Sequence, residues 1–487
     1  MSIFKQITRL AQHSAIYAIS NAFQKLSGLI LLPVYTNLNY IPSRSEFGDY
    51  VMIFTFIAFM YFVYSYGMDS AMLRYFFLGK RDRKIVFSST FFILLSTSVL
   101  TTLMIVVFSP QLGEVLLKSP TYAPYVRLAG LILFFDALGN LPYLILRAEE
   151  KSIQFTLFKL FRFLLELGLN VFFVVVLRKG VMGILYTSLT ASIINLLVML
   201  PIAFRYFTLR VDFSLAREML AFGLPFLPHG IAYTTIEMVD RFIVPAVLGK
   251  DALGLYGASY KFGAILLLLV NAFRNAWQPF FLNIAEQANA KEIYSRVLTY
   301  FVVASGVIVL LATFFIRDIL TFHFFDSFYL LGKEYWSGIS IIPIILLSYC
   351  FYGIYVILTP GFYITGRSKY MIVFTGSGAA INILVNLILL PVMYIYGAAM
   401  ATLLSYATMA ITIYLISQRI YPIPIEGMRI LKMGLLIFGF MGVYYLWDWS
   451  FLLRVGFSIL SILLSYFWVL NSRERLVLKQ QLSRLYS

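Results

Sequence analysis

The chain has 487 residues, of which 61% are apolar, 17% aromatic and only 12% charged. Soluble domains are about 45–50% apolar and about 25% charged, so the composition excludes a water-soluble fold. Lys and Arg exceed Asp and Glu by 16, and in a membrane protein such a surplus first reports topology rather than a nucleic-acid partner. The sequence therefore predicts an all-α integral membrane protein.

Apolar runs long enough to cross a bilayer occur about fourteen times, since a span needs only about 20 apolar residues. The connections between them are short, and the longest, at 317–338, is too small for a folded soluble domain. The runs cover roughly residues 13–35, 49–71, 86–108, 123–145, 156–177, 181–203, 222–247, 253–273, 297–316, 339–360, 371–391, 396–416, 433–447 and 451–470.

The distribution of basic residues predicts the orientation. About 26 Lys and Arg fall on the side of the two termini and about 8 on the opposite side, so the positive-inside rule places both termini in the cytoplasm. Four basic residues are counted within spans, namely Lys25, Arg127, Arg241 and Lys261.

A short pattern near the first span recurs in the second half of the chain. Residues 47–50 read Phe-Gly-Asp-Tyr and residues 253–256 read Leu-Gly-Leu-Tyr, while Gly183 recurs as Gly397. We predict two six-helix lobes, 1–210 and 211–420, followed by a segment of two extra transmembrane helices and a cytoplasmic amphipathic tail, 421–487. Lobes with an even number of spans insert in the same orientation, which predicts a pseudo-two-fold axis and a cavity between them. The alternative is that glycines coincide at helix ends by chance.

Three stretches carry a family resemblance: 28–50, 222–260 and 366–386 with Gly397. They resemble the polysaccharide transporter family, the lipid-linked oligosaccharide flippases of the multidrug/oligosaccharidyl-lipid/polysaccharide (MOP) exporter superfamily. The resemblance implies a multi-pass protein of the bacterial inner membrane. It would move a polyprenyl-diphosphate-linked oligosaccharide, such as a repeat unit of O-antigen, capsule or exopolysaccharide, from the cytoplasmic to the periplasmic leaflet by alternating access. The implied partners are this glycan, membrane lipids, and a glycan polymerase with other assembly proteins, around a monomer without cofactors.

Charges at membrane depth are costly, so each is expected to face a cavity or a partner. We predict that Lys25, Arg241 and Lys261 line the transport path and contact diphosphate or acidic sugars. At the cytoplasmic ends of spans, Arg74, Arg147 and Arg274 would capture the head group. The alternatives are internal salt bridges for the first set and contacts with lipid phosphates for the second.

Carboxylates within spans have two interpretations that the sequence leaves open. Each either pairs with a neighbouring cation or serves as a proton or sodium site that couples transport to an ion gradient. The residues concerned are Asp69, Asp136, Glu166, Glu237 and Asp240.

Three other functions are alternatives to the flippase. An enzyme is not expected, because His13, His229 and His323 are far apart and form no metal-binding or catalytic spacing. A multidrug exporter of organic cations would need carboxylates in its cavity, whereas cations are predicted there. A peptidoglycan-precursor flippase is the nearest alternative.

Overall fold

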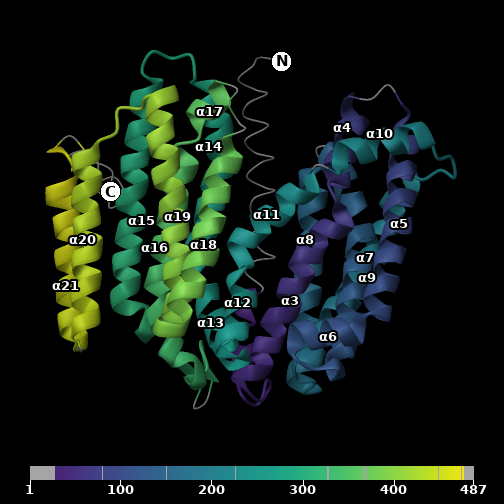
Figure 1. Ribbon diagram of the computed structural model, residues 1–487, viewed down its shortest axis with the longest axis horizontal. Coiled ribbons are helices and arrows are strands. Elements are labelled where there is room, and N and C mark those ends of the chain that lie inside the picture. Colours follow the sequence, from purple (N-terminus) through teal and green to yellow (C-terminus); the bar gives the residue numbers. More distant parts are fainter. Residues whose placement is uncertain are drawn as a thin grey trace, which may run out of the picture. The chain divides into compact units, whose positions relative to one another are not determined.

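The computed structural model describes residues 28–78, 81–149, 151–224, 226–325, 328–365, 367, 370–447, 449–472, 474 and 475, most of which are helical (Figure 1). The first predicted span, 13–35, lies mostly outside these residues. Lys25 and the end of the predicted amphipathic tail, 476–487, lie outside them as well.

Ten helical segments of the described chain are long and apolar enough to cross a membrane, or eleven if a bent pair counts as one span. Each of the ten coincides with a predicted span, which confirms an all-α multi-pass membrane protein. The segments are Arg44–Phe76, Arg83–Val107, Pro120–Ala148, Gly180–Tyr206, Ala290–Thr321, Lys333–Ile364, Tyr370–Met393, Ile395–Ile420, Gly427–Leu446 and Phe451–Val469.

Three further predicted spans are helical but charged, broken or bent. The run 156–177 forms α8 (Ser152–Asn170) and the π-helix η2 (Val171–Val176), and it carries several charges. The run 222–247 forms α11 (Phe226–Met238) and α12 (Asp240–Leu248). The run 253–273 falls on α13 (Lys250–Gly263) and α14 (Ile265–Asn283), which are bent by 45°. The predicted count of fourteen is therefore not matched span for span.

By its packing the chain divides into two units, Met1–Gly257 and Ala258–Ser487. In unit 1, side chains of α4, α5, α7 and α10 form a core around Met72, Phe87, Leu141 and Leu215, all fully buried. The bounds of these four helices and of the other elements of unit 1 not yet given are α2 (Leu32–Tyr35), α3 (Arg44–Ser65), α4 (Met68–Leu78), α5 (Arg83–Val107), α6 (Ser109–Leu117), η1 (Pro120–Tyr122), α7 (Ala123–Ala148), α9 (Gly180–Tyr206) and α10 (Phe213–Gly223).

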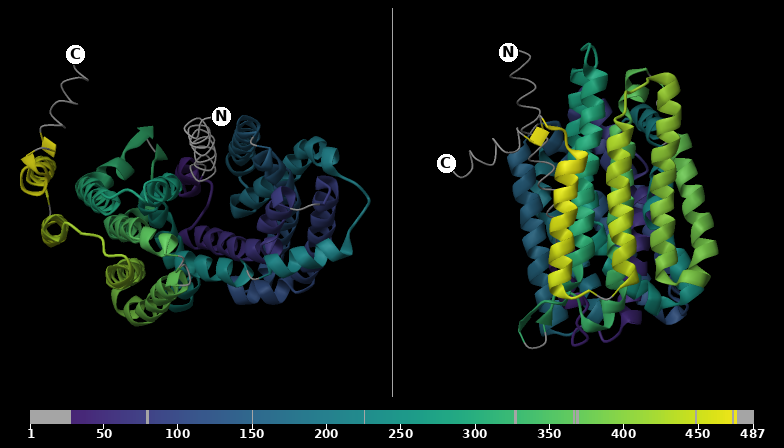
Figure 2. Two further views of the ribbon diagram at one scale, coloured as in Figure 1. Left: turned by 90° about the horizontal axis from the view of Figure 1, so that it is seen from above. Right: turned by 90° about the vertical axis from the view of Figure 1, so that its left-hand side faces the viewer.

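In unit 2, long helices lie side by side, and the α20–α21 pair packs against α15 (Figure 2). Gly306 of α15 lets the two elements approach closely, because a Cβ there would lie 2.4 Å from Met433 of α20. The elements are α15 (Ala290–Thr321), β1 (His323–Phe325), β2 (Phe328–Tyr329), η3 (Lys333–Ile341), α16 (Ile342–Ile357), α17 (Pro360–Ile364), α18 (Tyr370–Met393), α19 (Ile395–Ile420), α20 (Gly427–Leu446), α21 (Phe451–Leu464) and η4 (Ser465–Val469).

A short antiparallel hairpin, β1 with β2, lies in the long connection predicted at 317–338. Helix α15 also continues to Thr321, so the connection is shorter than predicted. The predicted lobes 1–210 and 211–420 and the segment 421–487 stay a prediction.

The two copies of the repeated pattern meet where α3 and α13 begin. A Cβ on Gly48 would lie 2.2 Å from the carbonyl oxygen of Lys250, and a Cβ on Gly254 would lie 2.0 Å from that of Arg44. Only glycine allows two backbones to approach this closely. The contact is reciprocal. Gly254 corresponds to Gly48 in the repeat, and Lys250 corresponds to Arg44 at the same offset in the sequence. A local two-fold relation between the repeats therefore exists at this crossing.

Ion pairs close the same crossing on both sides. Arg44 pairs with Asp251 at 2.8 Å, and Lys250 pairs with Asp49 at 2.8 Å. The Asp49 side chain is only 4% exposed, so its pairing cation compensates a charge removed from water.

Helix α10 begins at a polar contact outside the spans. The Asp212 carboxylate accepts hydrogen bonds from the backbone N–H groups of Ser214 and Leu215 and pairs with Arg81. The Leu215 amide and then the Arg81 guanidinium lower the pKa of this carboxyl below its ordinary value. Asp212 thus stays charged at neutral pH and fixes the start of α10.

Candidate functional site

Helix α8 carries a polar stripe along one face and an apolar stripe along the other. Lys159, Arg162, Glu166 and Asn170 follow one another at intervals of three or four residues, which places them on one side of the helix. The opposite side presents Ile153, Leu157, Phe161 and Leu164, all more than 40% exposed. In a bilayer the apolar face suits lipid and the charged face must turn inward.

Arg162 pairs with two carboxylates, and we call these three residues the Arg162 cluster. Its guanidinium lies 2.9 Å from Asp136 of α7 and 2.9 Å from Glu166 on its own helix. The three side chains are 12%, 25% and 21% exposed. Asp136 and Glu166, predicted as partners for a cation or as ion-coupling sites, are thus brought together by a cation that the sequence interpretation did not name.

Other polar side chains of unit 1 extend this network. The Lys159 ammonium lies 4.3 Å from the centre of the Tyr143 ring, and the Tyr143 hydroxyl donates to Asn195 at 2.7 Å. Asp69, at the start of α4, accepts long hydrogen bonds from Tyr61 and Asn140. The interior of unit 1 is therefore polar at membrane depth.

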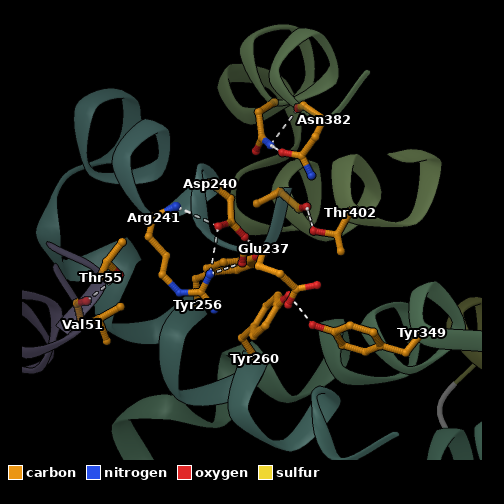
Figure 3. A network of polar contacts seen from close by, with 12 residues as sticks. Val51, Thr55, Glu237, Asp240, Arg241, Tyr256, Tyr260, Tyr349, Asn382 and Thr402 are labelled. Carbon is orange, nitrogen blue, oxygen red and sulfur yellow. Dashed lines mark hydrogen bonds and ion pairs between the residues drawn. The ribbon is translucent and has the colours of Figure 1, made fainter. Parts of the chain in front are cut away.

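Asp240 and Arg241 form a second charged site in unit 1 at the start of α12 (Figure 3). Arg241 donates to the Asp240 carboxylate at 3.2 Å and to the Glu237 carbonyl oxygen. The Tyr256 hydroxyl also donates to Asp240, whose side chain is 3% exposed. Arg241, predicted to line the path, thus has the internal ion pair that was its alternative. Asp240 accepts from the side chain and the backbone N–H of Arg241 and from Tyr256.

We expect Arg241→Gln alone to lower protein abundance, because it leaves the buried Asp240 without its cation. Losing one partner of a buried pair costs about 3–5 kcal/mol. Asp240→Asn with Arg241→Gln should restore abundance if the pair is structural only. Immunoblots of membranes, with export measured in parallel, check this; loss of export at restored abundance would show that the pair also serves transport.

The remaining predicted site residues are dispersed over both units. The Arg74 guanidinium lies 4.5 Å above the Phe222 ring of α10, and Arg147 is exposed in the last turn of α7. Lys261 is half-buried beside the bend after Gly263. Lys25 lies outside the described residues. Their assignment to substrate stays a prediction.

One predicted site residue, Arg274, lies in a cavity within unit 2. The cavity, which we call the Arg274 pocket, measures about 310 Å³, within the range of about 300–1,000 Å³ typical of small-molecule sites. Arg274 donates to the Tyr352 hydroxyl at 2.8 Å. The wall is mostly aromatic and comprises Trp277, Phe281, Tyr352, Tyr355 and Tyr363 with Gln278, Val356, Thr359 and Met371.

The pocket offers both charge and flat apolar surfaces to a ligand. Tyr352 and Tyr355 stack with their ring centres 6.1 Å apart, and Phe281 lies 5.8 Å from Tyr363. The Trp277 indole N–H is buried and has no hydrogen-bond partner among the described residues. Buried indole N–H groups usually have an acceptor, so this donor is an exception within the described residues. An anionic head group that also carries sugar rings matches these features.

The aromatic lining of the Arg274 pocket and the stripe on α8 were missed by sequence reasoning. The stripe had a detectable signal, namely charged residues three or four apart inside an apolar run. The pocket had none, because Arg274 and Tyr352 are 78 residues apart and belong to different helices.

Several solved membrane transporters and flippases have the same fold as this chain. The lipid II flippase MurJ is 17% identical with a TM-score of 0.70, covering 92% of this chain and 97% of MurJ. A multidrug resistance MATE transporter is 14% identical with a TM-score of 0.65, covering 84% and 95%. A MOP transporter from Pyrococcus furiosus is 15% identical with a TM-score of 0.61, covering 88% and 96%.

The chain thus has the fold of these transporters. The sequence pattern of the family described as polysaccharide biosynthesis protein matches residues 41–299, more than half of the chain. The chain belongs to this family, as the resemblance implied. No curated protein matches it.

Proposed function

We propose that the protein moves a polyprenyl-diphosphate-linked oligosaccharide across the bacterial inner membrane, from the cytoplasmic to the periplasmic leaflet. The diphosphate and the sugar hydroxyls cannot cross about 30 Å of hydrocarbon unaided. A protein that shields them while the lipid tail stays in the bilayer lowers that barrier. Membership of the polysaccharide biosynthesis family supports a glycan as the cargo.

The observation that carries the proposal is the Arg274 pocket. Its guanidinium can pair with a diphosphate or an acidic sugar, and its aromatic walls can cover the apolar faces of sugar rings. An organic cation, the cargo of a multidrug exporter, would be repelled by Arg274. A peptidoglycan precursor has the same head-group chemistry as the proposed cargo, so the pocket suits both. A polysaccharide flippase and a peptidoglycan-precursor flippase differ in the glycan that they carry.

The crossing of α3 and α13 supports alternating access. The reciprocal glycine contact and two ion pairs close the chain where α3 begins, on the side that the positive-inside rule assigns to the periplasm. When the helices rock, α3 and α13 can separate at the glycine contact and the two ion pairs can break. Both changes are reversible. In this proposal both termini face the cytoplasm, with the Arg274 pocket on their side.

We expect Arg274→Ala to reduce export of polysaccharide roughly ten- to hundredfold, because a hydrogen bond to a charged group contributes about 1.5–3 kcal/mol. Arg274→Lys keeps the charge but loses the planar guanidinium, so its export should be intermediate. The measurement is surface polysaccharide per unit of membrane-inserted protein.

Arg296→Ala is the matched control, since Arg296 is an exposed arginine of the same unit that does not line the pocket. It should export normally. Normal export by a well-expressed Arg274→Ala variant would overturn the role of the pocket.

A further inference from the structure

A second and larger cavity of unit 2 lies at the membrane face opposite the Arg274 pocket. It measures about 570 Å³. The end of α15, η3 at the start of the span Lys333–Ile364, the start of α19, the end of α20 and the start of α21 surround it, so five span ends meet there. We call it the Trp447 pocket. The span Lys333–Ile364 joins the two cavities, since its first residues line the Trp447 pocket and its last residues line the Arg274 pocket.

The Trp447 pocket gathers a large share of the indole rings of the chain. Trp336, Trp447 and Trp449 all line it, and the whole sequence has five tryptophans. An interfacial belt would direct such rings toward lipid. Here the Trp336 N–H bonds the Leu331 carbonyl oxygen and the Trp449 N–H bonds that of Tyr444, so the protein holds both rings at the cavity wall.

Polar groups complete the wall and are also held in place. Ser340 accepts from the Tyr396 hydroxyl through its side chain and from the Tyr445 hydroxyl through its carbonyl oxygen. Arg454 pairs with Asp318 at 2.5 Å. The Arg454 guanidinium also donates to the Phe314 carbonyl oxygen at 3.2 Å, so this side chain is fixed at the cavity wall.

Fixed indole rings beside a charged pair and several hydroxyls suit a saccharide. The C–H faces of a sugar ring pack on indole, while its hydroxyls exchange hydrogen bonds with Arg454, Asp318 and the tyrosines. A phospholipid head group is a poorer match, because Asp318 repels its phosphate and the arginine beside it is already paired.

We propose that the Trp447 pocket is a second saccharide site, which binds the sugar chain of the transported glycan at the face opposite the Arg274 pocket. This proposal rests on the flippase function. One unit then contacts sugar at both faces, so the glycan leaves one pocket and is received at the other. Rebinding on the far side would disfavour its return.

The test is photo-crosslinking in cells that make the native polysaccharide. A photo-crosslinking amino acid replaces Ser337, an exposed residue that lines the Trp447 pocket. After irradiation the full-length protein is purified, digested and analysed by mass spectrometry for adducts that contain sugar or phospholipid. We expect sugar adducts at Ser337. The same amino acid at Phe451, exposed at the same end of α21, should give lipid adducts only.

A third position separates this proposal from the flippase function. Gln278 lines the Arg274 pocket, so sugar adducts at Gln278 without any at Ser337 would overturn the second site alone. Absence of sugar at both positions would count against both proposals. Phospholipid alone at Ser337 would identify the cavity as a lipid site and overturn the saccharide assignment.

A substitution then tests the indole directly. Trp447→Ala should lower the sugar adduct at Ser337 by about tenfold, as expected for the loss of an aromatic contact. Trp447 is 69% exposed, so its replacement spares the fold. Leu446→Ala, at a neighbouring 77% exposed residue outside the cavity wall, should change the adduct by less than about twofold. Equal effects of the two substitutions would contradict the assignment.

Discussion

Replacing Arg162 by leucine is expected to remove most of the protein from the membrane. The change leaves Asp136 and Glu166, each within a hydrogen-bond distance of the missing guanidinium, as uncompensated charges at membrane depth. Breaking a buried ion pair in this way costs about 3–5 kcal/mol, a large share of a typical folding free energy of about 5–15 kcal/mol. Membrane abundance and thermal stability in detergent measure the loss.

The triple variant Asp136→Asn, Arg162→Leu, Glu166→Gln is the control, because removing all three charges together avoids an unpaired one. It should recover abundance. Its transport then decides between the two interpretations left open for the carboxylates: normal export means that they only hold the helices together, whereas stable protein without export means that they couple transport to ions. A stable Arg162→Leu variant would contradict the buried cluster.

Gly254→Ala is expected to stop the α3–α13 crossing from closing and so to abolish most export. The added methyl group would lie 2.0 Å from the Arg44 carbonyl oxygen, where backbone atoms must move apart. Overpacking of this kind costs about 1–3 kcal/mol, enough to shift the populations of two nearly balanced states by roughly five- to 150-fold.

The crossing can be monitored by the labelling of one engineered cysteine. Cys350 is the single native cysteine, so Cys350→Ala with Val51→Cys creates a unique thiol beside the crossing, where Val51 is 7% exposed. A membrane-impermeant maleimide should label it slowly in the parent and faster after Gly254→Ala. Gly434→Ala is the matched control, because a Cβ at Gly434 meets no atom within 4 Å. Unchanged labelling and export in the Gly254→Ala variant would contradict a closing contact.

Composition and periodicity predicted most of the fold. Apolar runs of span length require only local sequence, and ten of them coincide with long apolar helices. The hairpin after α15 was not predictable, since its two strands are too short for an alternating pattern.

The site was less predictable because it depends on which helices become neighbours. The sequence identified Asp136 as a charge within a span and Arg274 as a charge at a span end. Their partners Arg162 and Tyr352 come from other helices. The repeat, by contrast, was detectable in the sequence, and its two copies meet where Gly48 approaches Lys250 and Gly254 approaches Arg44. The two-fold axis between whole lobes stays a prediction.

The location of lipid-linked glycan in cells that lack this chain tests the proposed function most directly. The account predicts that polyprenyl-diphosphate-linked glycan accumulates on the cytoplasmic face and that surface polysaccharide falls. The parent chain should restore export, and Arg274→Ala at equal abundance should not. Unchanged surface polysaccharide, with no glycan accumulated on the cytoplasmic face, would contradict the account.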